Sequence, residues 1–281
     1  MRLFALLART CLCGGLLYPS APGAEGYDFG TRIRAYQYET TQEVVWASVG
    51  DQVRSTTSMT WKLILKGKGP GEAAVTVLRV QARHEGPGVR REVDSAADPG
   101  TEPDPLLGHL TALEGVTFGL TVEPTTGVVR AVTGTDMIAK RVAAAFPNLL
   151  DPAAPSPIAD QARALYSPDH LGKLWTAVLA LPSGPAHLPL AGPQGGTLVR
   201  TWTGDAWTAT LAEPEVAVRL GRPPTDITGV LTGMTGQGTL RLAEGLPQEA
   251  TGEVAFVLRL TALTQPVESR HRLRWRLTEA R

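Results

Sequence analysis

The sequence has few cysteines and no surplus of basic residues. Its 281 residues include only two cysteines, Cys11 and Cys13, both near the N-terminus. Lys and Arg together number 27, as do Asp and Glu, so the formal net charge is zero. Nucleic-acid binding relies on a surplus of basic side chains facing phosphate, and this balance therefore argues against a nucleic-acid partner.

Familiar catalytic motifs are also missing. The chain contains no G-x-S-x-G elbow, no H-E-x-x-H pair, no phosphate-binding P-loop and no calcium loop. The segment GMTGQG (233–238) lacks the strand-to-helix context of a dinucleotide site, and we interpret it as a turn. The glycines of 67–71 are interpreted as a hairpin tip. We therefore predict a protein that is not an enzyme, has no catalytic residues and needs no cofactor.

A metal site is not expected either. Zinc sites usually show close pairs of His or Cys, whereas the histidines here are scattered singly. They are His84, His109, His170, His187 and His271. An acidic cluster lies in a proline-rich loop and is either a weak cation site or, as we expect, a solvated loop. Its members are Asp94, Asp98, Glu102 and Asp104.

The N-terminus has the features of a signal peptide at 1–24. Arg2 and Arg9 give a positive start, TCLCGGLLY (10–18) is a short apolar core, and PSAPGA (19–24) offers cleavage after Ala24, within a few residues. Cleavage would leave 25 basic and 27 acidic residues, a net charge of −2, and no cysteine. We expect an exported protein of the periplasm or cell envelope, without a lipid anchor, folded without disulfides.

The stretch 116–146 is the most strongly patterned part of the chain. Apolar residues at every second position of 116–122 predict a strand with one buried face. Glu-Pro-Thr-Thr-Gly then permits a reversal, because its proline presets one dihedral angle and its glycine can take positive φ. Residues 128–132 predict the returning strand. Apolar spacing over 138–146 predicts a helix that Pro147 ends.

Further elements are predicted on both sides of this stretch. The predicted strands are 31–49, 53–66, 73–84, 89–93, 197–203, 206–211, 215–220, 238–243, 251–263 and 267–278. A short helix is predicted at 158–166. A second helix has Ser167 as N-cap and Pro168 at its first position, and it ends by Pro182.

This order predicts a mainly β protein with central helices (α+β). We expect one large curved antiparallel sheet, or half-barrel, with the helices packed on its concave face. A sheet of this size must curl or split. Residues 25–281 are expected to form a single β-rich domain. It comprises a strand-rich half at 31–133, a helical segment at 135–182 and a second strand-rich half at 197–278.

Three segments resemble a bacterial exported family of unknown function. They are YxYxxT at 36–41, AxVTVxRV at 73–80 and GVTFGLTVEPTTGVVRAVTGTD at 115–136. The family's hairpin pattern is G-x-x-F-x-x-x-x-x-P-x-G-x-V-x-x-V-x-G, here with one extra Thr in the turn. The resemblance covers roughly 33–142 and implies no activity. The expected architecture is also broadly similar to lipoprotein-carrier folds, in which a half-barrel with a helical lid holds acyl chains.

Large apolar side chains on the predicted inner face are candidates for a ligand cavity. They are Tyr36, Tyr38, Met59, Trp61, Phe118, Leu120, Trp175, Phe256 and Trp275. The alternative is that these side chains simply form the core. Truncating a buried residue such as Phe118 to Ala is expected to cost about 3–5 kcal/mol of stability.

Four arginines alternate with the inward residues of the last predicted strand and form a candidate face for an anionic partner. They are Arg270, Arg272, Arg274 and Arg276. The alternative is an ordinary solvated face. The function that we expect is an exported binding or carrier protein that holds an apolar small molecule or lipid under the helices. A structural or protein-interaction module, binding another envelope protein and having a filled core, is the alternative.

Overall fold

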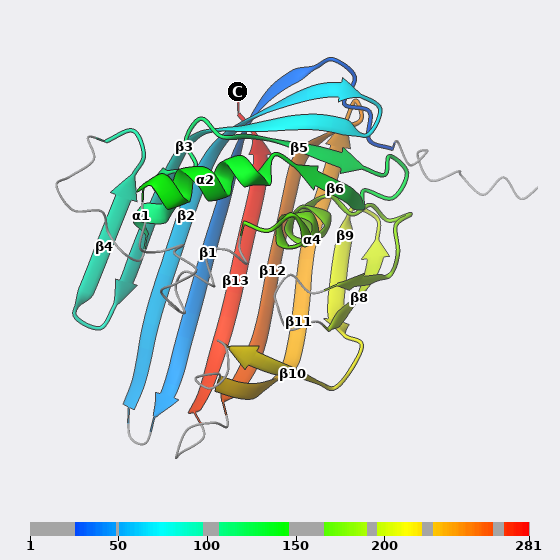
Figure 1. Ribbon diagram of the computed structural model, residues 1–281. Coiled ribbons are helices and arrows are strands. Elements are labelled where there is room, and N and C mark those ends of the chain that lie inside the picture. Colours follow the sequence, from blue (N-terminus) through cyan, green and yellow to red (C-terminus); the bar gives the residue numbers. More distant parts are fainter. Residues whose placement is uncertain are drawn as a thin grey trace, which may run out of the picture.

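One large antiparallel sheet dominates the protein (Figure 1). The computed structural model describes residues 26–48, 51–97, 107–145, 166–189, 196–220, 227–260 and 267–280. Thirteen strands form the sheet, in the order β6-β5-β3-β2-β1-β13-β12-β11-β9-β8-β7, with β4 paired to β3 and β10 to β11. The sheet is open, because β6 and β7 end the order on opposite sides. The expectation of a mainly β chain with one large antiparallel sheet is confirmed.

The strands differ greatly in length. They are β1 (Ile33–Ser48), β2 (Asp51–Gly69), β3 (Glu72–Gly86), β4 (Val89–Asp94), β5 (Thr117–Val122), β6 (Val129–Thr133), β7 (His187–Pro189), β8 (Thr197–Thr203), β9 (Ala206–Leu211), β10 (Glu215–Leu220), β11 (Ile227–Ala243), β12 (Leu246–Leu260) and β13 (Val267–Glu279). The described helices are α1 (Gly108–Thr111), α2 (Thr135–Ala145) and α4 (Pro168–Leu179). The long strands form the middle of the sheet, and the short strands lie toward its ends.

The first and last strands of the chain lie side by side and join its two strand-rich halves. β1 pairs with β2 on one side and with β13 on the other, and Tyr38 is opposite both Trp61 and Leu277. These three side chains are buried on the face of the sheet on which α4 lies, which we call the concave face. They share it because residues at the same register of an antiparallel sheet point to the same side. The alternation predicted from the sequence for these strands is confirmed.

Helix α4 lies between the two ends of the sheet. On the β6 side, the backbone N–H of Val129 donates a hydrogen bond of 3.0 Å to Thr176 Oγ1. On the β8 side, Nη2 of Arg200 donates one of 3.0 Å to the carbonyl of Ala177. Trp175 points from the helix into the core of the concave face. The helix therefore connects β6, at one end of the sheet, with β8, next to the last strand at the other end.

The other helices cover less of the sheet than expected. α2 buries Ile138 and Val142 in the main core, while Met137 on another of its faces is 47% exposed. α1 is a single turn. The short helix predicted at 158–166 lies outside the described residues except for Tyr166, which is buried. Helices are a minor part of the described chain, and α4 is the one that packs most fully against the sheet.

Two predictions in the second half of the chain are wrong. Residues 233–238 do not form a turn but lie inside β11, which begins at Ile227 and not at Gly238. Gly233, at φ +60°, sits in the register shift between Thr232 and Thr235, so the strand bends there and continues. Between α4 and β8, where the sequence predicted no strand, the chain forms the short edge strand β7.

Candidate functional site

The nine residues predicted to line a ligand cavity all lie on the concave side of the sheet or on the helix that faces it. Seven are buried, namely Tyr36, Tyr38, Trp61, Phe118, Leu120, Trp175 and Trp275. Met59 and Phe256 are only half-buried and pack against the same core from its margin. All nine predicted residues therefore lie on one face of the sheet. Met59 and Phe256 lie at the margin of the core, where the surface becomes more exposed.

Local sequence fixes the helix that covers the buried part. Ser167 is the N-cap of α4, and its hydroxyl oxygen accepts a 3.1 Å hydrogen bond from the backbone N–H of His170. Pro168 occupies the first turn. This start places Trp175, two turns later, with its ring centroid 6.2 Å from those of both Tyr38 and Phe118. The helix is therefore attached through an aromatic cluster.

Side chains fill the space beneath this helix. The cavity there measures about 10 Å³ and is bordered by Tyr36, Leu63, Leu65, Val75, Trp175 and Leu277. That volume is no more than a single water molecule needs. A ligand under α4 would require the helix to move, so a binding surface that is open in this structure must lie elsewhere.

A row of two tryptophans and two glycines crosses the sheet beside this cluster. Trp207 is opposite Gly238, Gly238 is opposite Gly252, and Gly252 is opposite Trp275. The two indole rings stack over the glycines, with centroids 5.8 Å apart and ring planes 23° apart. A Cβ atom at Gly252 would overlap the ring of Trp275. Because Gly238 and Gly252 have no Cβ atoms, the two indole rings have room to stack over them.

Arg200, a residue that we did not predict, is buried next to this row. It is 4% exposed, and its guanidinium carbon lies 4.2 Å from the ring centroid of Trp207 and 5.8 Å from that of Trp202. Burial lowers the pKa of Arg200 to about 10. The burial of Arg200 could have been predicted from the alternation of its strand. Arg200 is two residues from the buried Leu198 in β8, so both side chains point to the apolar face.

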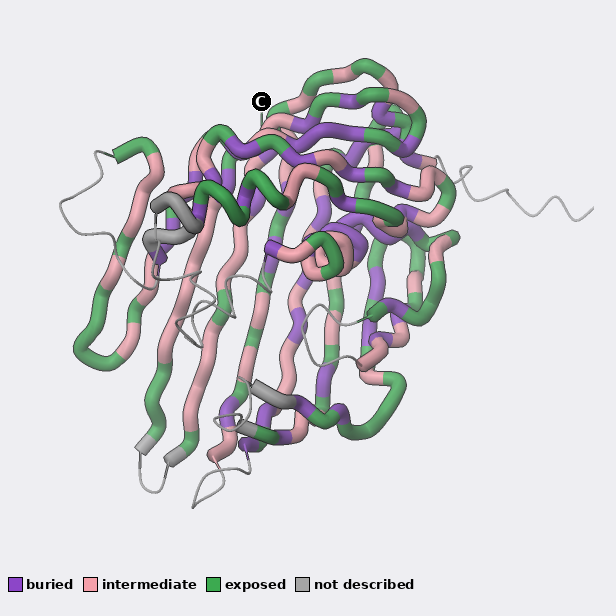
Figure 2. Tube along the Cα trace, in the orientation of Figure 1, coloured by how far each residue is buried: buried purple, intermediate pink, exposed green. Residues whose placement is uncertain are grey.

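Half-buried side chains continue along the concave face beyond α4. We call them the concave patch: Trp46, Met59, Leu231, Phe256, His271 and Leu273. His271 is opposite Phe256, and Trp46 is opposite Ser269, so the patch spans neighbouring strands. No described helix crosses this part of the sheet, but β10 lies across its far end (Figure 1). There Val218, Leu258 and Leu260 form a small second core, against which Trp46, Leu231 and Phe256 pack. Figure 2 shows that the long strands are largely half-buried or exposed here, whereas buried residues are frequent behind α4.

His271 is the polar member of the concave patch. Its ring stacks on Phe256 with centroids 4.6 Å apart, and it meets Trp46 edge-on at 6.3 Å. Nε2 lies 2.8 Å from Ser269 Oγ, whereas Nδ1 is buried and has no hydrogen-bond partner among the described residues. Burial lowers the pKa of His271. The patch therefore favours a neutral imidazole between two aromatic rings.

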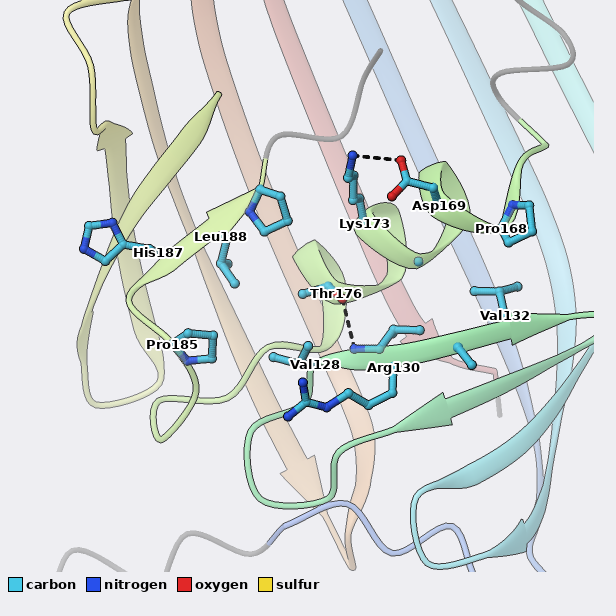
Figure 3. Close-up of a pocket in the computed structure, with 14 residues that line it drawn as sticks. Val128, Arg130, Val132, Pro168, Asp169, Lys173, Thr176, Pro185, His187 and Leu188 are labelled. Atoms are coloured by element: carbon cyan, nitrogen blue, oxygen red, sulfur yellow. Dashed lines mark hydrogen bonds and ion pairs between the residues drawn. The ribbon is translucent and has the colours of Figure 1, made fainter. Parts of the chain in front are cut away.

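A second candidate surface is a groove of about 450 Å³ between α4 and the sheet edges (Figure 3). Val128, Val132 and Leu188 supply much of its apolar lining, and Gly172 of α4 forms part of its wall. The charged side chains at its rim are already paired. Lys173 binds Asp169 at 2.8 Å, and Arg130 lies 3.4 Å from Glu123. The groove is therefore mainly apolar, with a charge-compensated rim.

The four predicted arginines are exposed on the convex face of β13, opposite the core. Each has a carboxylate within 4 Å, from Glu268 for Arg270, Glu253 for Arg272 and Arg274, and Glu249 for Arg276. Hydrogen bonds to Arg241 and Arg276 also lower the pKa of Glu249. Much of the positive charge of the row is therefore compensated within the sheet, and an anionic partner for it stays a prediction.

The residues that could serve in catalysis or metal binding are dispersed over the described chain. Within the described ranges, no group of three or more His, Cys, Asp or Glu residues is placed to hold a metal ion. In the acidic cluster, Asp94 binds Arg79, which lowers the pKa of its carboxyl group; the other three members lie outside the described residues. His84 pairs with Thr57 at 2.9 Å. None of the helices in the described chain has the length and apolar character needed to cross a membrane.

Comparison with known proteins adds little. No family model matches the sequence, and no curated protein matches it significantly. Among solved structures, DynF from the dynemicin biosynthesis pathway of Micromonospora chersina is 10% identical with a TM-score of 0.22, over 92% of this chain and 86% of that chain. The translocator domain of autotransporter NalP from Neisseria meningitidis is 8% identical with a TM-score of 0.26, over 89% and 88%. Scores this low carry no argument about fold or function.

Proposed function

We propose that this protein is an exported, non-enzymatic binding or carrier protein of the bacterial cell envelope, and that it holds an apolar ligand on the concave patch. The observation that carries the proposal is a set of large apolar side chains left half-buried on the concave face beyond α4. Contiguous apolar surface on a soluble protein commonly marks a binding site. The ligand class is a lipid or another apolar small molecule.

The energetics are adequate for such a ligand. Each Å² of apolar surface removed from water contributes about 25 cal/mol, and a bound ligand removes its own apolar surface from water together with that of the patch. Association and ordering costs subtract from this gain. A micromolar dissociation constant corresponds to a net gain of about 8 kcal/mol after these costs.

The sequence features support the same proposal. The N-terminal segment has the pattern of a signal peptide, and three segments resemble an exported family of unknown function. Lipoprotein-carrier folds, in which a half-barrel with a helical lid holds acyl chains, provide the architectural analogy. In this chain α4 takes the position of the lid, and the concave patch extends beyond it.

Binding of a fluorescent acyl-chain probe, with a matched pair of variants, tests the proposal. Met59→Lys places a charge in the concave patch, whereas Thr60→Lys places the same charge on the opposite face one residue later. We expect Met59→Lys to weaken binding at least tenfold and Thr60→Lys to leave it unchanged. Equal binding by both variants, or a wild-type protein that does not bind the probe, would contradict the proposal.

The filled space beneath α4 favours a second candidate, a protein-interaction module. The groove beside β6 offers an edge strand next to apolar side chains, and an extended peptide can add to such an edge. In this case the partner would be another envelope protein. Gly172→Phe, which places a bulky side chain in the groove, would abolish capture of that partner and would leave binding of the acyl-chain probe intact.

A further inference from the structure

Arg200 is a buried charge without a counter-charge in the described chain. Its pKa of about 10 keeps the guanidinium ionised at neutral pH. Buried charges in proteins are normally paired, because desolvating an ion is costly. Yet no carboxylate of the described residues lies within 4 Å of its guanidinium. Among the same residues, the hydrogen bond of this side chain goes to the neutral carbonyl of Ala177, and its buried Nε has no partner.

A second unpartnered donor lies on the same row of aromatic rings. Trp275 is 9% exposed, and its Nε1 is buried without a hydrogen-bond partner among the described residues. Its ring stacks on Trp207, which in turn stacks under the guanidinium of Arg200. Buried donors without acceptors are uncommon in folded proteins and call for an explanation.

The concave patch begins at this row. Leu273 precedes Trp275 by two residues on β13 and faces the same side of the sheet, so its side chain lies about 7 Å further along the strand. His271 and Phe256 follow in the same direction. In the register of the sheet, Arg200 of β8 is level with Leu273, but β9, β11 and β12 lie between them. The stacked rings of Trp207 and Trp275 bridge this gap. A cationic group thus lies to one side of the apolar side chains, an arrangement that suits a molecule with a charged head and an apolar tail.

We propose that the ligand of the concave patch is an anionic amphiphile, whose carboxylate or phosphate head pairs with Arg200 while its alkyl chain lies along Leu273 and Phe256. This inference rests on the proposed function and adds the class of ligand to it. A guanidinium suits planar, bidentate recognition of either anion, and a charged acceptor binds it more strongly than the carbonyl of Ala177 does.

Calorimetric titration with three probes that have the same number of carbon atoms tests the inference. The probes are laurate, dodecyl phosphate and dodecanol, with inorganic phosphate as a probe for the head alone. We expect the wild-type protein to bind laurate or dodecyl phosphate about 10- to 100-fold more tightly than dodecanol, the gain that hydrogen bonds to charged groups provide. Comparing laurate with dodecyl phosphate identifies the head that is preferred.

Variants at Arg200 assign the preference to this residue. Arg200→Met keeps an unbranched side chain but removes the charge, and we expect it to bind all three amphiphiles as weakly as the wild type binds dodecanol. Arg200→Lys should regain part of the preference. Arg54→Met, on the convex face of β2 and outside the arginine row of β13, is the matched control and should behave as wild type.

The outcomes separate the inference from the function on which it rests. Equal binding of the anions and dodecanol by the wild-type protein would overturn the inference and leave an apolar binding site in place. A preference that survives in a folded Arg200→Met variant would also overturn it.

If no amphiphile binds, the inference and the proposed function both fail. Binding of inorganic phosphate as tight as that of dodecyl phosphate would show that the apolar tail plays no part, which also overturns the inference. The wild-type comparison decides the matter even if the variants do not fold.

Discussion

Replacing Gly252 with alanine tests the stacking of Trp207 and Trp275 over the two glycines that lie between them in the sheet. The added Cβ would overlap the ring of Trp275, and this ring cannot shift freely because it stacks on Trp207 at 5.8 Å. Overpacking a buried site costs about 1–3 kcal/mol. Loss of an aromatic pair costs about 0.5–1.5 kcal/mol more. We therefore expect Gly252→Ala to lower the free energy of unfolding by about 2–4 kcal/mol.

Urea denaturation followed by tryptophan fluorescence measures this loss, and near-UV circular dichroism reports the stacked pair. In the double variant Gly252→Ala with Trp275→Leu, the alanine should cost much less than it does alone, because the clashing ring is gone. The coupling between the two sites is obtained from the double-mutant cycle. A loss below about 0.5 kcal/mol for Gly252→Ala alone would refute the placement of the ring over this glycine.

Three further variants test other parts of the structure. Phe118→Ala should cost about 3–5 kcal/mol because Phe118 is 2% exposed, and a loss under 1 kcal/mol in urea denaturation would show that it faces solvent. Gly172→Ala should stabilise the protein by about 0.5–1 kcal/mol, because alanine favours a helix over glycine. The added Cβ would meet Val132 Cγ2 at 3.7 Å, an ordinary van der Waals contact. A lower melting temperature of the variant would contradict this prediction. Burial lowers the pKa of His271, so below the ordinary value of about 6.5 the unfolded state binds more protons and stability falls as the pH falls. His271→Gln should flatten this slope between pH 7 and 5, and an unchanged slope would count against its buried neutral state.

Much of the sheet could be predicted because its strands alternate. Side chains on a strand point to opposite faces in turn, so the apolar parity of β1 and β13 marks their buried face directly. The cap of α4 could be predicted for a similar reason, because Ser167 and Pro168 act on the first turn alone. These signals are local and need no knowledge of distant residues.

The features that could not be predicted depend on contacts between segments that are distant in the sequence. The glycines of 233–238 are typical of a turn, but in this fold Gly236 and Gly238 lie in a strand because the ring of Trp207 occupies the space that side chains would need. Arg200 was missed because a charged residue is normally assigned to the solvent face, and its burial becomes evident only when α4 and β9 are placed beside β8. The size of the space beneath α4 follows from packing, which the sequence does not specify.

Native mass spectrometry of the protein, purified gently from the cells that produce it, tests the central claim of a ligand on the concave patch most directly. The account predicts an added mass in a one-to-one ratio that is lost on denaturation, the recovery of an amphiphile with an anionic head, and the loss of that mass in Met59→Lys but not in Thr60→Lys. A bare mass for the wild-type protein, together with no binding of laurate, dodecyl phosphate or dodecanol, would contradict it.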